Sequence, residues 1–118
     1  MAKNENRVDP MKVIDPNSDE AYVLEFSRES VKFAEARGFK ISELTDFPQT
    51  NIPMLFFAAF RKNHKSISRD KTDKLLEELG GLTAPEIERL VLLYNQPNES
   101  LILTDEGGRK NCRLRIEL

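Results

Sequence analysis

The sequence predicts a mainly α fold: a small helical bundle around a central apolar helix, with an N-terminal β-hairpin and a flexible C-terminal tail. Three observations predict it. Residues 52–60 are the most apolar stretch of a polar chain, and their apolar side chains recur at helical spacing. Four segments carry signals for the start and stop of a helix. Two β-prone runs near the N-terminus flank a cluster of turn-forming residues.

The N-terminal part predicts a hairpin. Lys12–Ile14 and Ala21–Phe26 are β-prone, and Asp15–Glu20 between them is rich in turn formers. A lone two-stranded hairpin is marginally stable in water, so it must lean on helices or join a sheet in another subunit. The polar residues 1–11 before it are expected to be flexible.

Two helices are predicted in the middle of the chain. Ser27 is placed to cap the first, which runs to about Arg37, where Gly38 supplies a left-handed stop. Residues 41–44 form at most one further turn. The central helix is expected over residues 50–63, with Pro53 in its first turn, where a missing N–H costs nothing.

Two more helices follow. Either Ser66 or Ser68 caps a helix over Arg69–Leu79. Residues 83–86 read Thr-Ala-Pro-Glu, a capping box that starts the last helix, and Pro97 breaks or kinks that helix. The predicted domain spans residues 12–103.

Composition limits the function classes. The 118 residues fit one domain, and the formal net charge of −2 argues against a general nucleic-acid binder. A single cysteine, Cys112, cannot form an internal disulfide, which is typical of cytoplasmic proteins. We find neither a signal peptide nor a stretch that would cross a membrane. Residues 104–118 are expected to be a flexible tail, although apolar and charged residues alternate from Cys112 onward.

We find no pattern that predicts catalysis or a cofactor. His64 is the only histidine, and 48 positions separate it from Cys112, the only cysteine. Their number is too small for a His/Cys metal cluster. Neither glycine pair, at 80–81 or at 107–108, matches a phosphate-binding loop. The sequence therefore predicts a protein that is not an enzyme.

Two binding classes remain open. One is an adaptor or chaperone with an apolar helical surface. The other is a nucleic-acid reader, because residues 71–79, 80–81 and 83–94 have helix–turn–helix order. Glu86 and Glu88 weaken this alternative, since both would face phosphates at the start of the reading helix.

Six short motifs follow one another along the chain: Leu24-Glu-Phe-Ser-Arg28, Ser30-Val-Lys32, Glu35-Ala-Arg-Gly-Phe39, Ile52-Pro-Met-Leu-Phe56, Ala59-Phe60 and Lys62-Asn-His64. In this order they resemble a family of small tail proteins from long-tailed phages and prophages of Gram-positive bacteria. The resemblance covers about Val23 to Ile102. These proteins are usually taken to be tail assembly chaperones.

The resemblance implies a client and a place of action. Such chaperones bind the tape measure protein, a long and largely helical chain, and keep it soluble while the tail tube protein polymerises around it. They act in the host cytoplasm and leave before the virion is complete. Many associate with themselves, and many are made in two lengths by a ribosomal frameshift.

Our own reading of the helices predicts where a client helix would bind. We expect a groove between the central helix and the last long helix, and the alternative for each aromatic residue is ordinary core. The expected partner-binding residues are Phe57, Phe60, Leu90 and Tyr94 in the groove, with Arg61, Lys62 and His64 at its rim.

The charge pattern predicts self-association. Residues 61–74 hold six Lys/Arg against two Asp, a balance of +4, whereas residues 77–106 hold seven acidic residues against one arginine, a balance of −6. The basic end of one copy would meet the acidic end of the next. The alternative is that each run is simply a solvated face.

The predicted tail also holds a candidate frameshift site. The dipeptide Lys110-Asn111 is what the slippery codons AAA AAC encode, and it follows residues 107–109, Gly-Gly-Arg. Our hypothesis is that Cys112–Leu118 is the in-frame ending of a short form. The alternative is an ordinary basic tail, because dipeptide matches are common.

Overall fold

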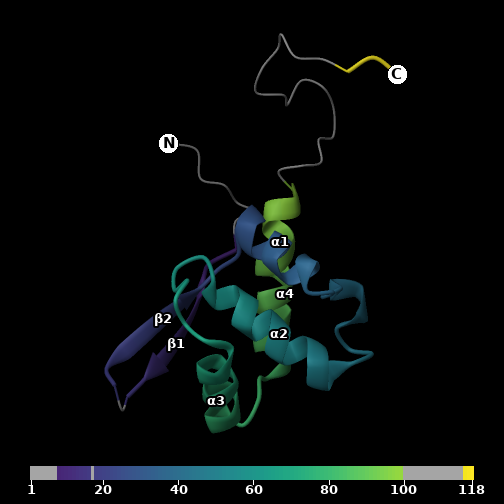
Figure 1. Cartoon of the computed structure of the whole chain (residues 1–118). Coiled ribbons are helices and arrows are strands. Elements are labelled where there is room, and N and C mark those ends of the chain that lie inside the picture. The colour runs from purple at the N-terminus through teal and green to yellow at the C-terminus, as the bar shows by residue number, and fades with distance from the viewer. Residues whose placement is uncertain (1–7, 17, 100–115) are drawn as a thin grey trace.

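The computed structural model in Figure 1 is a β-hairpin set beside four α-helices, and it describes residues 8–16, 18–99 and 116–118. This is the mainly α fold with an N-terminal hairpin that the sequence predicts. The predicted tail falls mostly on residues 100–115, outside the described residues. In chain order the elements are β1 (Met11–Asp15), β2 (Glu20–Leu24), α1 (Arg28–Ala36), the 3₁₀ turn η1 (Ile41–Glu43), α2 (Pro48–Phe60), α3 (Arg69–Leu79) and α4 (Ala84–Glu99).

The hairpin is antiparallel, with Met11 opposite Leu24 and Asp15 opposite Glu20. Because side chains alternate between the two faces of a strand, Val13, Tyr22 and Leu24 share one face, and all three are buried. This face packs toward α2, so the hairpin leans on a helix, as its small size requires.

Helix α1 begins and ends where the sequence predicts. The Ser27 hydroxyl accepts a hydrogen bond from the Ser30 N–H at 3.3 Å, and the Ser30 hydroxyl oxygen accepts one from the Ser27 N–H at 2.7 Å. This reciprocal pair satisfies N–H groups that the helix itself leaves unpaired. Gly38 has φ +84°, which favours glycine, and the Phe39 N–H returns to the Ala34 carbonyl at 3.1 Å.

Helix α2 differs from the prediction at both ends. It starts at Pro48 rather than Thr50, so Pro48 takes the first-turn position and Pro53 lies inside the helix. The first-turn role predicted for Pro53 is therefore wrong, because two prolines compete for it and Phe47–Pro48 already closes the preceding loop. The helix ends at Phe60 rather than Asn63. The Arg61 N–H donates to the Ala58 carbonyl, three residues back, at 3.1 Å, and the side chains of Asn63 and His64 then bond to Val23 of β2.

Most of α2 is surrounded by protein. Every residue from Met54 to Phe60 is buried, and the helix packs against α1, α3, α4 and β2. Its buried Asn51 donates a hydrogen bond from Nδ2 to the Glu43 carbonyl at 2.8 Å. This bond holds η1 against the start of α2, and it removes the cost of burying an amide.

The last two helices follow their local signals. Helix α3 has the predicted bounds, with Ser68 accepting from the Lys71 N–H at 3.1 Å and Gly80 in the left-handed region at φ +75°. Thr83 and Glu86 form the predicted reciprocal cap at the start of α4. Helix α4 does not break at Pro97 but continues to Glu99. The missing N–H of Pro97 removes only one intrahelical bond, close to the helix end.

Candidate partner-binding site

The four apolar residues predicted to line a groove are core residues. Phe60 and Leu90 are 0 % exposed, Tyr94 is 2 % exposed and Phe57 is 9 % exposed. The Tyr94 ring packs edge-on against Phe26 and Phe39, with centroid distances of 5.1 and 5.3 Å. The prediction of an open groove between α2 and α4 is therefore wrong, because aromatic rings fill the space between these helices and α1.

Phe57 and Phe60 lie in the same kind of aromatic packing. Phe60 meets Tyr22 at 5.3 Å and Phe56 at 5.0 Å between ring centroids, and Phe57 meets Phe33 at 5.6 Å. Edge-to-face pairs at this spacing add stability beyond their buried area. These rings join the hairpin, α1 and α2 into one core, and they are not accessible to a partner helix.

His64 lies against β2 instead of at a binding rim. Its Nε2 accepts a hydrogen bond from the Val23 N–H at 3.0 Å, and the neighbouring Asn63 donates from Nδ2 to the Val23 carbonyl at 3.1 Å. The ring also packs against Tyr22 at 5.2 Å. His64 is therefore a structural residue that closes the edge of the strand.

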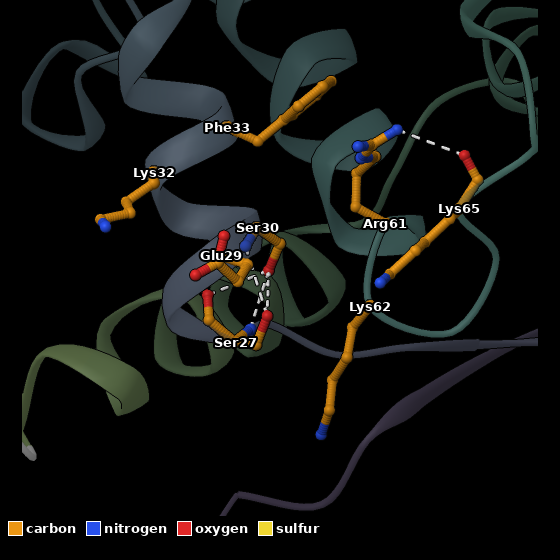
Figure 2. Close-up of a pocket in the computed structure, with 8 residues that line it drawn as sticks. All are labelled: Ser27, Glu29, Ser30, Lys32, Phe33, Arg61, Lys62 and Lys65. Carbon is orange, nitrogen blue, oxygen red and sulfur yellow. Dashed lines mark hydrogen bonds between the residues drawn. The ribbon is translucent and has the colours of Figure 1, made fainter.

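Arg61 and Lys62 do lie at an open surface. A depression of about 560 Å³ lies where the start of α1 faces the turn after α2. Figure 2 shows the side chains that line it. We call it the basic depression, because its lining holds four cations and one carboxylate. The lining residues are Ser27, Glu29, Ser30, Lys32, Phe33, Arg61, Lys62 and Lys65.

Two of the four cations in the basic depression, Arg61 and Lys62, already interact with other groups of the protein. Lys62 Nζ lies 2.9 Å from a carboxylate oxygen of Glu25, and Arg61 donates to the Lys65 carbonyl at 3.2 Å. The Arg61 guanidinium also lies 4.2 Å from the centre of the Phe33 ring, a cation–π contact. In the described part of the chain neither Lys32 nor Lys65 has an ion-pair partner. The depression therefore suits an acidic segment better than an apolar helix.

A second open surface is apolar. The ends of α2, α3 and α4 meet at a groove of about 300 Å³, which we call the terminal groove. Two large apolar side chains are exposed close to it in the sequence: Phe47, 61 % exposed, precedes α2, and Leu79, 52 % exposed, ends α3. The groove is lined by Pro48, Gln49, Ile52, Pro53, Leu76, Gly81, Leu82 and Ile87.

The two helix ends at the terminal groove are acidic. Glu77 and Glu78 lie in the last turn of α3, which holds no basic residue, and Glu86 and Glu88 lie near the start of α4. Carboxylates at a helix C-terminus add to the negative end of the helix dipole. An apolar ligand with flanking cations therefore fits this groove better than a neutral one.

Both tyrosines have a raised pKa. Burial raises the pKa of Tyr94 to about 12, and the nearby Glu35 carboxylate adds to this effect. The hydrogen bond from the Tyr22 hydroxyl to the Glu20 carboxylate raises the pKa of Tyr22 to about 12, and burial acts in the same direction. Both phenols therefore keep their protons well above neutral pH, and neither is activated as a nucleophile or base.

In the described ranges we find no group of three His, Cys, Asp or Glu side chains placed to hold a metal ion, and no helix long and apolar enough to cross a membrane.

Comparisons with known proteins give a family but no function. The chain matches no curated protein and no solved structure. A family model for a domain of unknown function matches residues 1–118, and the chain therefore belongs to that family, DUF5055.

Proposed function

We propose that this protein is a tail assembly chaperone of a long-tailed phage or prophage. It binds the tape measure protein and keeps it soluble in the host cytoplasm while the tail tube assembles, and it leaves before the virion is complete. The resemblance over residues 23–102 supports the class. The observation that carries the proposal is the terminal groove, an open apolar surface of the kind that receives a helix.

The terminal groove has the size and chemistry for one or two apolar anchors of a client helix. Its walls are half-buried side chains, among them Ile52, Leu76 and Ile87, which a client would cover completely. Covering one large apolar side chain contributes about 1.5–3 kcal/mol. Lysine or arginine beside the anchors would pair with the glutamates of α3 and α4. A tape measure segment with this pattern is the ligand that we propose.

This proposal moves the client site from the middle of the bundle to its edge. In place of the buried aromatic residues we now propose Ile52 and Leu82, which line the groove, together with the exposed Phe47 and Leu79, which neighbour it in the sequence. The buried α2 acts as the central element that holds these helix ends in position. Arg61 and Lys62 share the basic depression with Lys32 and Lys65, which have no ion-pair partner among the described residues. This surface is left for an acidic partner, for which the tail tube protein is the candidate.

Co-expression with a tape measure fragment tests the proposal. The wild-type protein should raise the soluble fraction of the fragment above its level when expressed alone. The double variant F47D/L79D should lose this effect and keep the helical circular dichroism, because both side chains are exposed. Leu92→Asp is the matched control, since Leu92 is 50 % exposed on α4 but lies five residues from Ile87, the nearest lining residue in the sequence, whereas Phe47 and Leu79 lie within two residues of a lining residue.

One result would contradict the proposed function, and another would contradict only the proposed site. If the wild-type protein leaves the fragment insoluble, the function is wrong. If F47D/L79D works as well as the wild type, the function stands but the terminal groove is not the site.

The helix–turn–helix alternative finds less support. Helices α3 and α4 do follow each other across Gly80 and Gly81. However, residues 75–88, which form the corner between them, include four glutamates and no Lys or Arg. Nucleic-acid binding depends on neutralising phosphates with Lys and Arg, which this corner does not offer.

A further inference from the structure

The outer edge of β2 is closed by the turn that follows α2. The Val23 N–H donates to His64 and the Val23 carbonyl accepts from Asn63, as described above. Two residues later in the chain, the Glu25 N–H donates to the Ala59 carbonyl at 3.1 Å. These bonds point away from β1, so they fix which residues of the hairpin direct their backbone groups outward.

The outer edge of β1 is open in the described structure. In an antiparallel pair, residues directly opposite each other point their backbone groups either toward each other or both outward. The backbone groups of Val23 point away from β1, so those of its partner Lys12 point away from β2. The same holds for the next pair of this kind, Ile14 and Ala21. No described residue hydrogen-bonds the backbone of Lys12 or Ile14. The Ile14 side chain is 70 % exposed beside this edge.

We infer that β1 pairs antiparallel with β1 of a second copy of this chain, so that two hairpins form one four-stranded sheet. The register that uses the open groups places Lys12 opposite Ile14 of the second copy, with Val13 on the two-fold axis. Lys12 and Ile14 then exchange two reciprocal pairs of backbone hydrogen bonds with their counterparts. The contact is isologous, and it closes at two copies.

A second copy fits this edge for two reasons. The same edge is self-complementary: the register sets Lys12 against Ile14 and Met11 against Asp15, so that like charges are never directly opposite. An open edge of this length is also a template that proteins normally cover or pair. The inference does not depend on the proposed client, because the terminal groove lies elsewhere.

Proline variants test the pairing directly. Ile14→Pro removes an outward N–H and leaves the bonds between β1 and β2 in place. Ala21→Pro is the matched control, because Ala21 also points its N–H outward, but from β2. By sedimentation velocity, we expect the wild type and Ala21→Pro to be dimers and Ile14→Pro to be a monomer. The dimer should persist from about 0.1 M to about 1 M salt, because backbone hydrogen bonds are little screened.

Hydrogen exchange of the wild type keeps the test decisive even if a proline variant does not fold. The amides of Lys12 and Ile14 should become protected as the protein concentration rises. A wild-type monomer at high concentration overturns the inference, and so does a dimer that Ile14→Pro leaves intact. Protection of both amides in a monomer would show that the same chain covers the edge, and it would overturn the inference. An assembly that salt dissolves would point instead to the charge split.

Discussion

Exchanging Phe60 and Phe47 for alanine distinguishes a core residue from a residue of the proposed binding surface. Phe60 is 0 % exposed and meets the rings of Tyr22 and Phe56, whereas Phe47 is 61 % exposed. Removing a fully buried phenylalanine costs about 3–5 kcal/mol, through lost burial and the cavity that remains. An exposed side chain of the same type costs about 0.5 kcal/mol or less. We therefore expect Phe60→Ala to lower the free energy of unfolding several-fold more than Phe47→Ala.

Urea unfolding followed by circular dichroism measures both values. In a domain of this size a loss of 3 kcal/mol lowers the melting temperature by about 12 °C or more. If Phe60→Ala is too unstable to measure, Phe60→Leu, which keeps part of the side-chain volume, should still cost more than Phe47→Ala. The reasoning is refuted if Phe60→Ala costs less than about 1 kcal/mol, because Phe60 would then be accessible, as the sequence first suggested.

Two further predictions concern pH and the tail. The folded pKa of Tyr94 is about 12 against an ordinary value of about 10, so the unfolded chain loses this proton first. The stability that depends on a protonated Tyr94 is complete below about pH 10, and it falls by a few kcal/mol as the pH rises toward 12. Tyr94→Phe should flatten this alkaline loss in urea unfolding at several pH values, and an unchanged slope would contradict the burial argument. If Lys110-Asn111 marks a frameshift, mass spectrometry of the native protein should find a minor longer product that shares residues 1–111. Codons AAG AAT at these positions would remove the slippery run.

The helix ends were predictable because their signals are local. Ser27, Ser68 and the Thr83–Glu86 pair each satisfy backbone N–H groups within three residues, and Gly38 and Gly80 each supply a left-handed residue at the stop. Such patterns depend on a few neighbouring residues and little on the rest of the fold. The start of α2 was missed because Pro48 and Pro53 both satisfy the local rule for a first turn. Only packing against η1, through Asn51, selects the earlier start.

The position of the proposed binding surface could not be predicted from local signals. Helix α2 is apolar on all sides, so periodicity alone does not indicate which of its residues face a partner. The terminal groove joins Ile52, Leu76 and Ile87 from three helices, and no local pattern brings them together. His64 looked like a rim cation because it follows a helix end, whereas its partner Val23 lies 41 positions earlier. The sequence held one signal for this surface: Phe47 is a large apolar residue next to a proline, at the end of a predicted loop.

The acidic end of α3 supports the proposed client on energetic grounds. Glu77 and Glu78 lie where the helix dipole disfavours them, and Glu86 and Glu88 of α4 add charge of the same sign at the next helix start. A sequence under selection for stability alone would place lysine at these exposed positions of α3, at a gain of some tenths of a kcal/mol each. Local choices that oppose stability collect at functional sites. The apolar groove between these carboxylates therefore favours a cationic, amphipathic helix, and the basic depression on α1 and α2 favours a partner of opposite charge, so the two surfaces select different ligands.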